Sequence, residues 1–192
     1  MIRIGIIGDI GSGKTHVGKL FRHPIFNADQ EVANLYKKSR KCYDKLKKAL
    51  PEYINSFPIS KKLLTKAILK SNSNLKKIIE IVHPEIRVKM NRFIKKNKNK
   101  KIIILDIPLL IENKLNKKDD ILIFVEGKKK EILKRLKKRP NFNEKIINRL
   151  KTFQLSLEVK KKKSNFVIKN NFKNNIVKKN VKKIEKIILL NA

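Results

Sequence analysis

Residues 2–22 constrain the fold of this chain more than any other segment. Residues 2–7 read IRIGII, an apolar run that predicts a short buried strand, and residues 14–22 can form a helix. The pattern G-x-x-x-x-G-K-[ST] joins them, and its residues are Gly8, Asp9, Ile10, Gly11, Ser12, Gly13, Lys14 and Thr15. Between a strand and a helix, such glycines let successive backbone N–H groups face one anion, beside the positive end of the helix dipole. The segment therefore predicts a loop that binds the phosphates of a nucleotide.

Two side chains of this loop have separate expected roles. Lys14 can reach the β- and γ-phosphates of ATP, and the Thr15 hydroxyl can ligate Mg²⁺. A dinucleotide-binding turn fits less well, because the stretch ends in Lys-Thr and lacks the G-x-G-x-x-G spacing. The plain alternative is a glycine-rich turn followed by an unrelated lysine.

Other short apolar runs predict the remaining strands of a sheet. A second strand ends near residues 26–29, and further strands are expected at 101–107, 121–125 and 165–168. Their β-branched, apolar character suits strands that are covered on both faces, and the stretches between them have helical spacing. This alternation predicts an α/β fold, a P-loop three-layer sandwich around a parallel, five-stranded sheet.

A chain of 192 residues is expected to form one domain with two helical additions. The core is predicted to comprise 1–36, 97–130 and 164–192. Residues 37–96 carry no strand signal and predict a helical insertion that forms the wall of the acceptor site. Residues 131–163 are helical and basic, and predict a lid.

Two aspartates lie at the ends of predicted strands, at the sheet edge where ligands bind in open α/β folds. Asp29 ends the stretch Asn27-Ala28-Asp29 and is the candidate base that positions an attacking hydroxyl and accepts its proton. Its alternative role is to cap a helix that begins near Gln30. Asp106 lies at the end of the third predicted strand, where it either holds Mg²⁺ through a water molecule or ends the strand in a turn.

Arginine is scarce in this chain, so the positions that retain it are informative. Only eight of the 50 basic residues are arginine. Arg135 and Arg139 are four residues apart on one face of a predicted helix, and Arg149 follows them. The planar guanidinium group contacts phosphate oxygens in a bidentate way that lysine does not reproduce. These arginines are candidates for contact with the transferred phosphate, and ordinary surface charge is the alternative.

The formal net charge of +34 raises the alternative of a nucleic-acid-binding or membrane-binding protein. Lysine, asparagine and isoleucine are spread over the entire chain, however, and tryptophan is absent. The Lys-rich stretches carry few aromatic residues for base stacking. We therefore expect a solvated basic surface with no specific nucleic-acid partner.

Cysteine content and hydropathy indicate a reducing compartment. Cys42 is the only cysteine, so no disulfide framework can form. The longest apolar run, at 102–111, is interrupted by Asp106 and Pro108 and is too short to span a bilayer. The N-terminal residues lead directly into the phosphate loop and leave no room for a leader peptide. We expect a cytoplasmic protein without a membrane partner.

Together these segments resemble the dephospho-coenzyme A kinases over almost the whole chain. The family's loop G-G-I-G-S-G-K-[ST]-T appears here as GDIGSGKTH, and its D-A-D appears at residues 27–29. Its H-P in the helical insertion matches His83-Pro84, and its P-L-L-x-E matches residues 108–112.

The second half of the chain adds to this resemblance. The lid arginines of the family match Arg135 and Arg139. The late pattern Q-x-x-x-x-x-K-x-x-x-A-D-x-V-I-x-N matches Gln154, Lys160 and Asn170 without a gap.

The resemblance implies transfer of a phosphoryl group from Mg·ATP to the ribose 3′-hydroxyl of dephospho-coenzyme A, the last step of coenzyme A synthesis. It implies that Asp29 is the base, that the loop as far as His16 binds the phosphates of ATP, and that the lid arginines take part in catalysis with Lys14. The acceptor-binding residues that it implies are Asp29, Lys61, His83, Pro108 and Leu109.

Four positions depart from the family pattern. Asn27 replaces the first aspartate, His16 the second hydroxyl of the loop, Pro140 the acid after the lid arginine, and Lys61 an arginine of the substrate domain. None of these changes removes a group that the chemistry requires. Another small-metabolite or nucleoside monophosphate kinase is an alternative that would share the loop and lid. A nucleotide-dependent nucleic-acid-binding protein is the alternative that the charge supports.

Overall fold

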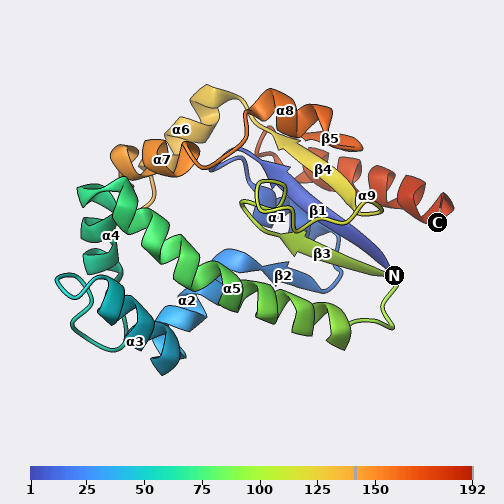
Figure 1. The fold of residues 1–192 in the computed structure, drawn as a ribbon. Coiled ribbons are helices and arrows are strands. Elements are labelled where there is room, and N and C mark those ends of the chain that lie inside the picture. Colours follow the sequence, from blue (N-terminus) through green and yellow to red (C-terminus); the bar gives the residue numbers. More distant parts are fainter. Residues whose placement is uncertain (141, 192) are drawn as a thin grey trace. The chain divides into compact units, whose positions relative to one another are not determined.

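The computed structural model describes residues 1–140 and 142–191. The strands among these residues form a five-stranded sheet in the order β2-β3-β1-β4-β5, and every neighbouring pair is parallel (Figure 1). The strands are β1 (Ile2–Gly8), β2 (Ile25–Asn27), β3 (Ile102–Asp106), β4 (Ile121–Glu126) and β5 (Phe166–Lys169). The predicted α/β fold with a parallel, five-stranded sheet is confirmed.

Parallel strands need a crossover between them, and helices form the crossovers from β1 to β2, from β2 to β3 and from β4 to β5, whereas residues 107–120 join β3 to β4 through turns. The helices in the described residues are α1 (Lys14–Leu20), α2 (Ala28–Lys38), α3 (Arg40–Ala49), α4 (Lys61–Lys70), α5 (Asn72–Lys96), α6 (Lys129–Lys137), α7 (Glu144–Lys151), α8 (Leu157–Lys162) and α9 (Asn174–Leu190). None of them combines the length and the apolar composition that a membrane crossing requires.

The chain divides into two compact units. The first comprises Met1–Asn27, Asn97–Asn143 and the residues from Lys151 onward, and it contains the whole sheet. The second comprises Ala28–Lys96 and Glu144–Leu150, and it is helical.

One apolar core joins the sheet of the first unit to α1 and α9. Side chains alternate between the two faces of a strand, so Ile4 and Ile6 of β1 point to the same face and enter this core together. Helix α9 adds four apolar residues at spacings of three and four, which form one face of the helix; they are Val177, Val181, Ile184 and Ile188. Figure 1 shows α1 and α9 on the same side of the sheet.

The other face of the sheet is covered in part by the segment that follows β3. Gly5 of β1 lies so close to Leu110 of this segment that a Cβ atom at position 5 would collide with the leucine side chain. Leu110 is fully buried. Burial on both faces explains why β1, β3 and β4 read as nearly continuous apolar runs.

Helix α5 is the longest helix of the second unit and packs against α2, α3 and α4. Its buried residues recur every three or four positions and include Leu75, Ile78 and Val82. Ser39 and Ser60 cap α3 and α4, because each side chain accepts a hydrogen bond from a backbone N–H three residues later. The helical character that we expect between the second and third strands is confirmed.

Two helix boundaries differ from the sequence predictions. Helix α2 begins at Ala28, so Asp29 lies inside its first turn and is not a cap before Gln30. Helix α6 ends at Lys137, so Arg135 and Arg139 do not share a helix, and the prediction that they do is wrong. Pro140 follows Arg139 and disfavours the helical conformation for the residue before it, which gives the physical reason for this end.

Candidate active site

The phosphate loop follows β1 at the carboxyl edge of the sheet. Gly11 has a φ of 85° and Gly13 a φ of 92°. Residues with a Cβ atom rarely adopt such a φ, so glycine is needed at both positions. The Asp9 carboxylate accepts a hydrogen bond from the Ile10 N–H at 2.7 Å, and the Lys151 ammonium lies 3.8 Å from its other oxygen. These contacts hold the first half of the loop. Helix α1 begins directly after the loop, at Lys14.

The Lys14 ammonium is folded back over the loop. Its Nζ donates to the carbonyl oxygen of Asp9 at 2.7 Å and to that of Gly8 at 3.3 Å. A cation that rests on backbone carbonyls inside a phosphate loop can turn to the β- and γ-phosphates of a bound nucleotide. His16 lies in the first turns of α1 and is exposed.

Three polar side chains meet beside the loop. The Thr15 hydroxyl donates to Asp106 Oδ2 at 2.6 Å, and Asn27 Nδ2 donates to the same oxygen at 2.6 Å. Asn27 and Asp106 are register partners at the ends of β2 and β3, which explains why residues far apart in sequence meet here. Asp106 is only 3% exposed. The structure thus joins two predicted metal-site residues, Thr15 and Asp106, to the position where the family has an aspartate.

The chemistry of this group fits Mg²⁺. A hydroxyl oxygen and a carboxylate oxygen are hard ligands, which Mg²⁺ prefers, and this ion keeps several waters and phosphate oxygens in its coordination shell. No group of three or more acidic, histidine or cysteine side chains that could hold a metal occurs among the described residues. One hydroxyl and one carboxylate supply two such ligands beside the phosphate loop, which suits an ion that also binds nucleotide phosphates.

The two predicted lid arginines differ in their surroundings. The Arg135 guanidinium stacks over the Phe172 ring at 4.6 Å from its centroid, in the geometry of a cation–π contact. Arg139 follows α6 and is exposed, and its backbone N–H donates to the Leu136 carbonyl. Leu136 itself packs against Gly11, so α6 is directly in contact with the phosphate loop.

Glu112, of the family's P-L-L-x-E stretch, is part of a buried polar cluster. Its carboxylate lies 2.8 Å from the Lys160 ammonium, and the two side chains are 9% and 1% exposed. Lys160 also donates to Gln154 Oε1 at 3.0 Å, and the Leu155 N–H donates to Glu112 Oε1 at 3.0 Å. The structure therefore brings together three residues that the sequence relates only through the family pattern. Pro108 and Leu109 precede Glu112 in the same turn and are half-buried.

The other predicted site residues belong to the second unit. Asp29 lies in the first turn of α2 and is exposed, and Lys61 is the exposed first residue of α4. His83 lies within α5, where burial, with a smaller contribution from the Arg87 charge, lowers its pKa. The imidazole is therefore neutral near pH 7. Arg149 donates a hydrogen bond to the backbone carbonyl of Ile68.

Some contacts around the loop could not be found from the sequence. Phe172 belongs to no sequence motif. Lys151 is one of 42 lysines (50 basic residues less eight arginines), and nothing in the sequence distinguishes it from the others. Asn170 belongs to the family pattern, but nothing in that pattern indicates its contact with Ser12, where Asn170 Nδ2 donates to the backbone carbonyl at 2.8 Å. These contacts depend on how distant segments pack, which local patterns do not encode.

The comparisons of this chain with known proteins agree on one family. The dephospho-CoA kinase family model matches residues 2–176. The chain is 31% identical to a dephospho-CoA kinase of Wolbachia pipientis wMel over 194 residues, covering 98% of this chain and 99% of that protein. It is also 31% identical to a dephospho-CoA kinase of Bacillus cereus, over 87% of each chain.

Solved structures with the same fold include the protein TT1252 from Thermus thermophilus, with a TM-score of 0.78 and 25% identity over 99% of this chain and 97% of that chain. A dephospho-CoA kinase from Campylobacter jejuni has a TM-score of 0.65 and 21% identity, covering 97% of this chain and 96% of the other. A shikimate kinase from Acinetobacter baumannii shares the fold more distantly, with a TM-score of 0.52, 16% identity and coverage of 100% and 94%. On the extent of the family match and the identity to these relatives, the chain belongs to the dephospho-CoA kinase family.

Proposed function

We propose that this protein transfers the γ-phosphoryl group of ATP to the ribose 3′-hydroxyl of dephospho-CoA, giving CoA and ADP. The observation that carries the proposal is the phosphate loop with Thr15 bonded to Asp106, in a chain whose residues 2–176 match the dephospho-CoA kinase family. The coverage of nearly the whole chain supports a complete kinase site and not the loop alone.

The loop supplies the phosphate-binding part of the site. Its backbone N–H groups and the start of α1 surround the β- and γ-phosphates, and Lys14 exchanges its carbonyl contacts for phosphate oxygens. Thr15 and Asp106 would hold Mg²⁺, directly or through water, and Asn27 keeps the Asp106 carboxylate in place. When bound with ATP, Mg²⁺ neutralises charge on the transferring phosphate.

Asp29 is the general base in this proposal. It accepts the proton of the acceptor 3′-hydroxyl, the hydroxyl oxygen forms a bond to the γ-phosphorus, and the bond between that phosphorus and the bridging oxygen of ADP breaks. Arg135 and Arg139 contribute charge to the transferred phosphate, and the stacking of Arg135 on Phe172 restrains its guanidinium group. His83, Lys61, Pro108 and Leu109 contribute to acceptor binding. The neutral His83 imidazole can donate or accept a hydrogen bond without adding charge.

Acceptor selectivity tests this function. Initial rates of ADP release are measured with dephospho-CoA and with AMP, which share the adenosine part but differ in the pantetheine arm. Contacts to the arm can orient the ribose hydroxyl, so we expect kcat/KM for dephospho-CoA to exceed that for AMP by at least about a hundredfold. Equal turnover of the two acceptors would reject the dephospho-CoA kinase activity and leave a less selective kinase.

The location that we propose is the cytoplasm. A single cysteine, Cys42, which is buried, suits a reducing compartment, and both proposed substrates are small molecules.

A further inference from the structure

Asn170 is buried against the phosphate loop although it comes from the segment after β5. The residue is 3% exposed, and its side-chain Nδ2 donates to the backbone carbonyl oxygen of Ser12 at 2.8 Å. Its backbone N–H donates to the carbonyl of Glu126, the last residue of β4, at 2.7 Å. The contact therefore joins the loop to the end of the central sheet, which is a rigid support.

The orientation of the Asn170 amide group is fixed by both of its ends. Ser12 offers a carbonyl oxygen, which can only accept, so the Asn170 nitrogen must face it. The Phe172 backbone N–H can only donate, and it donates to Asn170 Oδ1 at 2.8 Å. A rotated amide group would face both partners with the wrong atom.

This contact determines the direction of one backbone N–H in the loop. The Ser12 carbonyl and the Gly13 N–H belong to the same planar peptide unit, in which they point in opposite directions. Holding the Ser12 oxygen on Asn170 therefore turns the Gly13 N–H away from Asn170. Gly13 has a φ of 92°, and a Cβ atom at this position would collide with Asn170 Nδ2. A side chain at position 13 is thus excluded both by the backbone and by Asn170.

We propose that Asn170 is a positioning residue for phosphoryl transfer. It sets the Ser12–Gly13 peptide so that the Gly13 N–H faces the phosphates of the nucleotide before ATP binds. Donors that already point at the phosphates need no reorganisation on binding, which raises affinity and favours the transition state. The inference rests on the proposed function of the loop and adds to it a residue outside the G-x-x-x-x-G-K-[ST] pattern.

The variant Asn170→Asp tests the inference. A carboxylate keeps an acceptor for the Phe172 N–H but places an oxygen against the Ser12 carbonyl, so the peptide is no longer held. We expect KM for ATP to rise about tenfold or more, with a similar loss in ADP affinity measured by calorimetry without turnover. The KM for dephospho-CoA should change by less than about threefold, since Asn170 acts on the nucleotide phosphates.

The neighbouring residue gives a matched control. Asn171 is exposed, and its side-chain oxygen accepts from the Lys173 N–H at 3.0 Å, a bond that aspartate preserves. Asn171→Asp adds the same charge one residue away, so its ATP KM should stay within about twofold of wild type. Asn170→Ala removes the contact without a new charge, and it replaces Asn170→Asp if the latter does not fold.

Several results would overturn the inference. One is an ATP KM and an ADP affinity within twofold of wild type in both Asn170 variants. A second is an equal rise in KM for both substrates together with a lowered Tm. A third is failure of both Asn170 variants to fold while Asn171→Asp folds. Either of these two results would assign Asn170 a structural role only. If wild-type protein binds no ADP, the proposed function of the loop fails, and the inference fails with it.

Discussion

At the scale of single residues, the contacts of Asn27 explain how the chain accommodates its departure from the family's first aspartate. The Asn27 amide donates to Asp106 Oδ2 at 2.6 Å, so it stabilises a carboxylate that is almost fully buried. An aspartate at position 27 would place two carboxylates side by side, an arrangement that raises the pKa of one of them. An amide also cannot take a proton from the acceptor. Of the two aspartate positions in the family's D-A-D, only position 29 keeps a carboxylate in this chain, so Asp29 is the base that we propose.

Replacing Asp29 with Asn tests this assignment. Asn has nearly the same shape but cannot accept the proton, so kcat at saturating dephospho-CoA should fall by about a hundredfold or more. ATP affinity should be unchanged, and Tm should change little, because the substitution is nearly isosteric and removes a single charge from the exposed first turn of α2. Steady-state kinetics and thermal unfolding measure these quantities.

Glu31→Gln is the control for this variant. Glu31 lies in the same first turn of α2 and pairs with Lys89 of α5 at 2.8 Å, so its replacement removes the same charge from the same helix. We expect its kcat to stay within about twofold of wild type. Near-normal kcat in Asp29→Asn, with chemistry rate-limiting, would refute Asp29 as the base.

At the scale of elements, the buried pair Lys160–Glu112 connects α8 to the turn after β3. The ammonium and carboxylate groups are 2.8 Å apart and nearly inaccessible to water. Each charge needs the other, since removing one partner of a buried pair leaves an uncompensated charge. The pair thus fixes the turn that contains Pro108 and Leu109, both of which we propose to contact the acceptor.

The variant Lys160→Met should lower the free energy of unfolding by about 3–5 kcal/mol in urea titrations. Lys161→Met is the matched control, because Lys161 is the next residue of α8 and pairs with Glu126 at 2.7 Å, but with side chains 49% and 35% exposed. That change should cost less than about 1 kcal/mol. The double variant Lys160→Met/Glu112→Met should recover most of the loss. Equal destabilisation by Lys160→Met and Lys161→Met would contradict the claim that the buried pair stabilises the fold more than the exposed pair does.

The sequence predicts elements of this fold where the pattern is local. The strand before Gly8, the loop and the start of α1 follow from an apolar run, three glycines and a lysine that are neighbours in sequence. The pairing of Asn27 with Asp106 was not predictable in the same way, because it depends on the register of β2 against β3. Likewise, the contact of Asn170 with Ser12 joins residues 158 positions apart. The early end of α6 was predictable from Pro140, which restricts Arg139.

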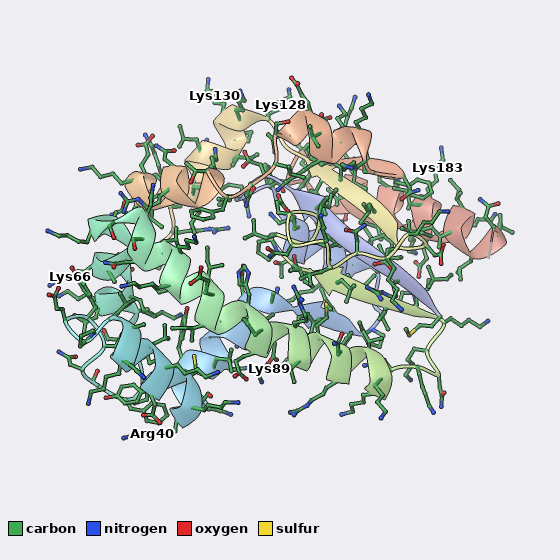
Figure 2. The ribbon with its side chains drawn as sticks, in the orientation of Figure 1. Arg40, Lys66, Lys89, Lys128, Lys130 and Lys183 are labelled. Carbon is green, nitrogen blue, oxygen red and sulfur yellow. The ribbon has the colours of Figure 1, made fainter. Side chains whose placement is uncertain are left out.

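At the scale of the whole molecule, the 50 basic residues are spread along the entire chain. Of the basic residues labelled in Figure 2, Arg40 and Lys89 belong to α3 and α5 of the second unit, and Lys183 belongs to α9 of the first. A surface that recognises nucleic acid concentrates its charge on one face or along one helix. A solvated basic surface without a nucleic-acid partner stays a prediction, and the proposed function rests on the phosphate loop.

The product of the reaction tests the central claim most directly. Wild-type protein is incubated with Mg·ATP and dephospho-CoA, ADP and CoA are quantified, and the position of the new phosphate is determined by phosphorus NMR. We expect one CoA for each ADP, with the phosphate on the 3′-oxygen of the ribose. The Lys14→Ala variant should retain its fold and form CoA at least about a hundredfold more slowly, because the charge that neutralises the β- and γ-phosphates is gone. ADP formed without phosphorylated dephospho-CoA, phosphate on another hydroxyl, or a Lys14→Ala rate within a few-fold of wild type would contradict the account.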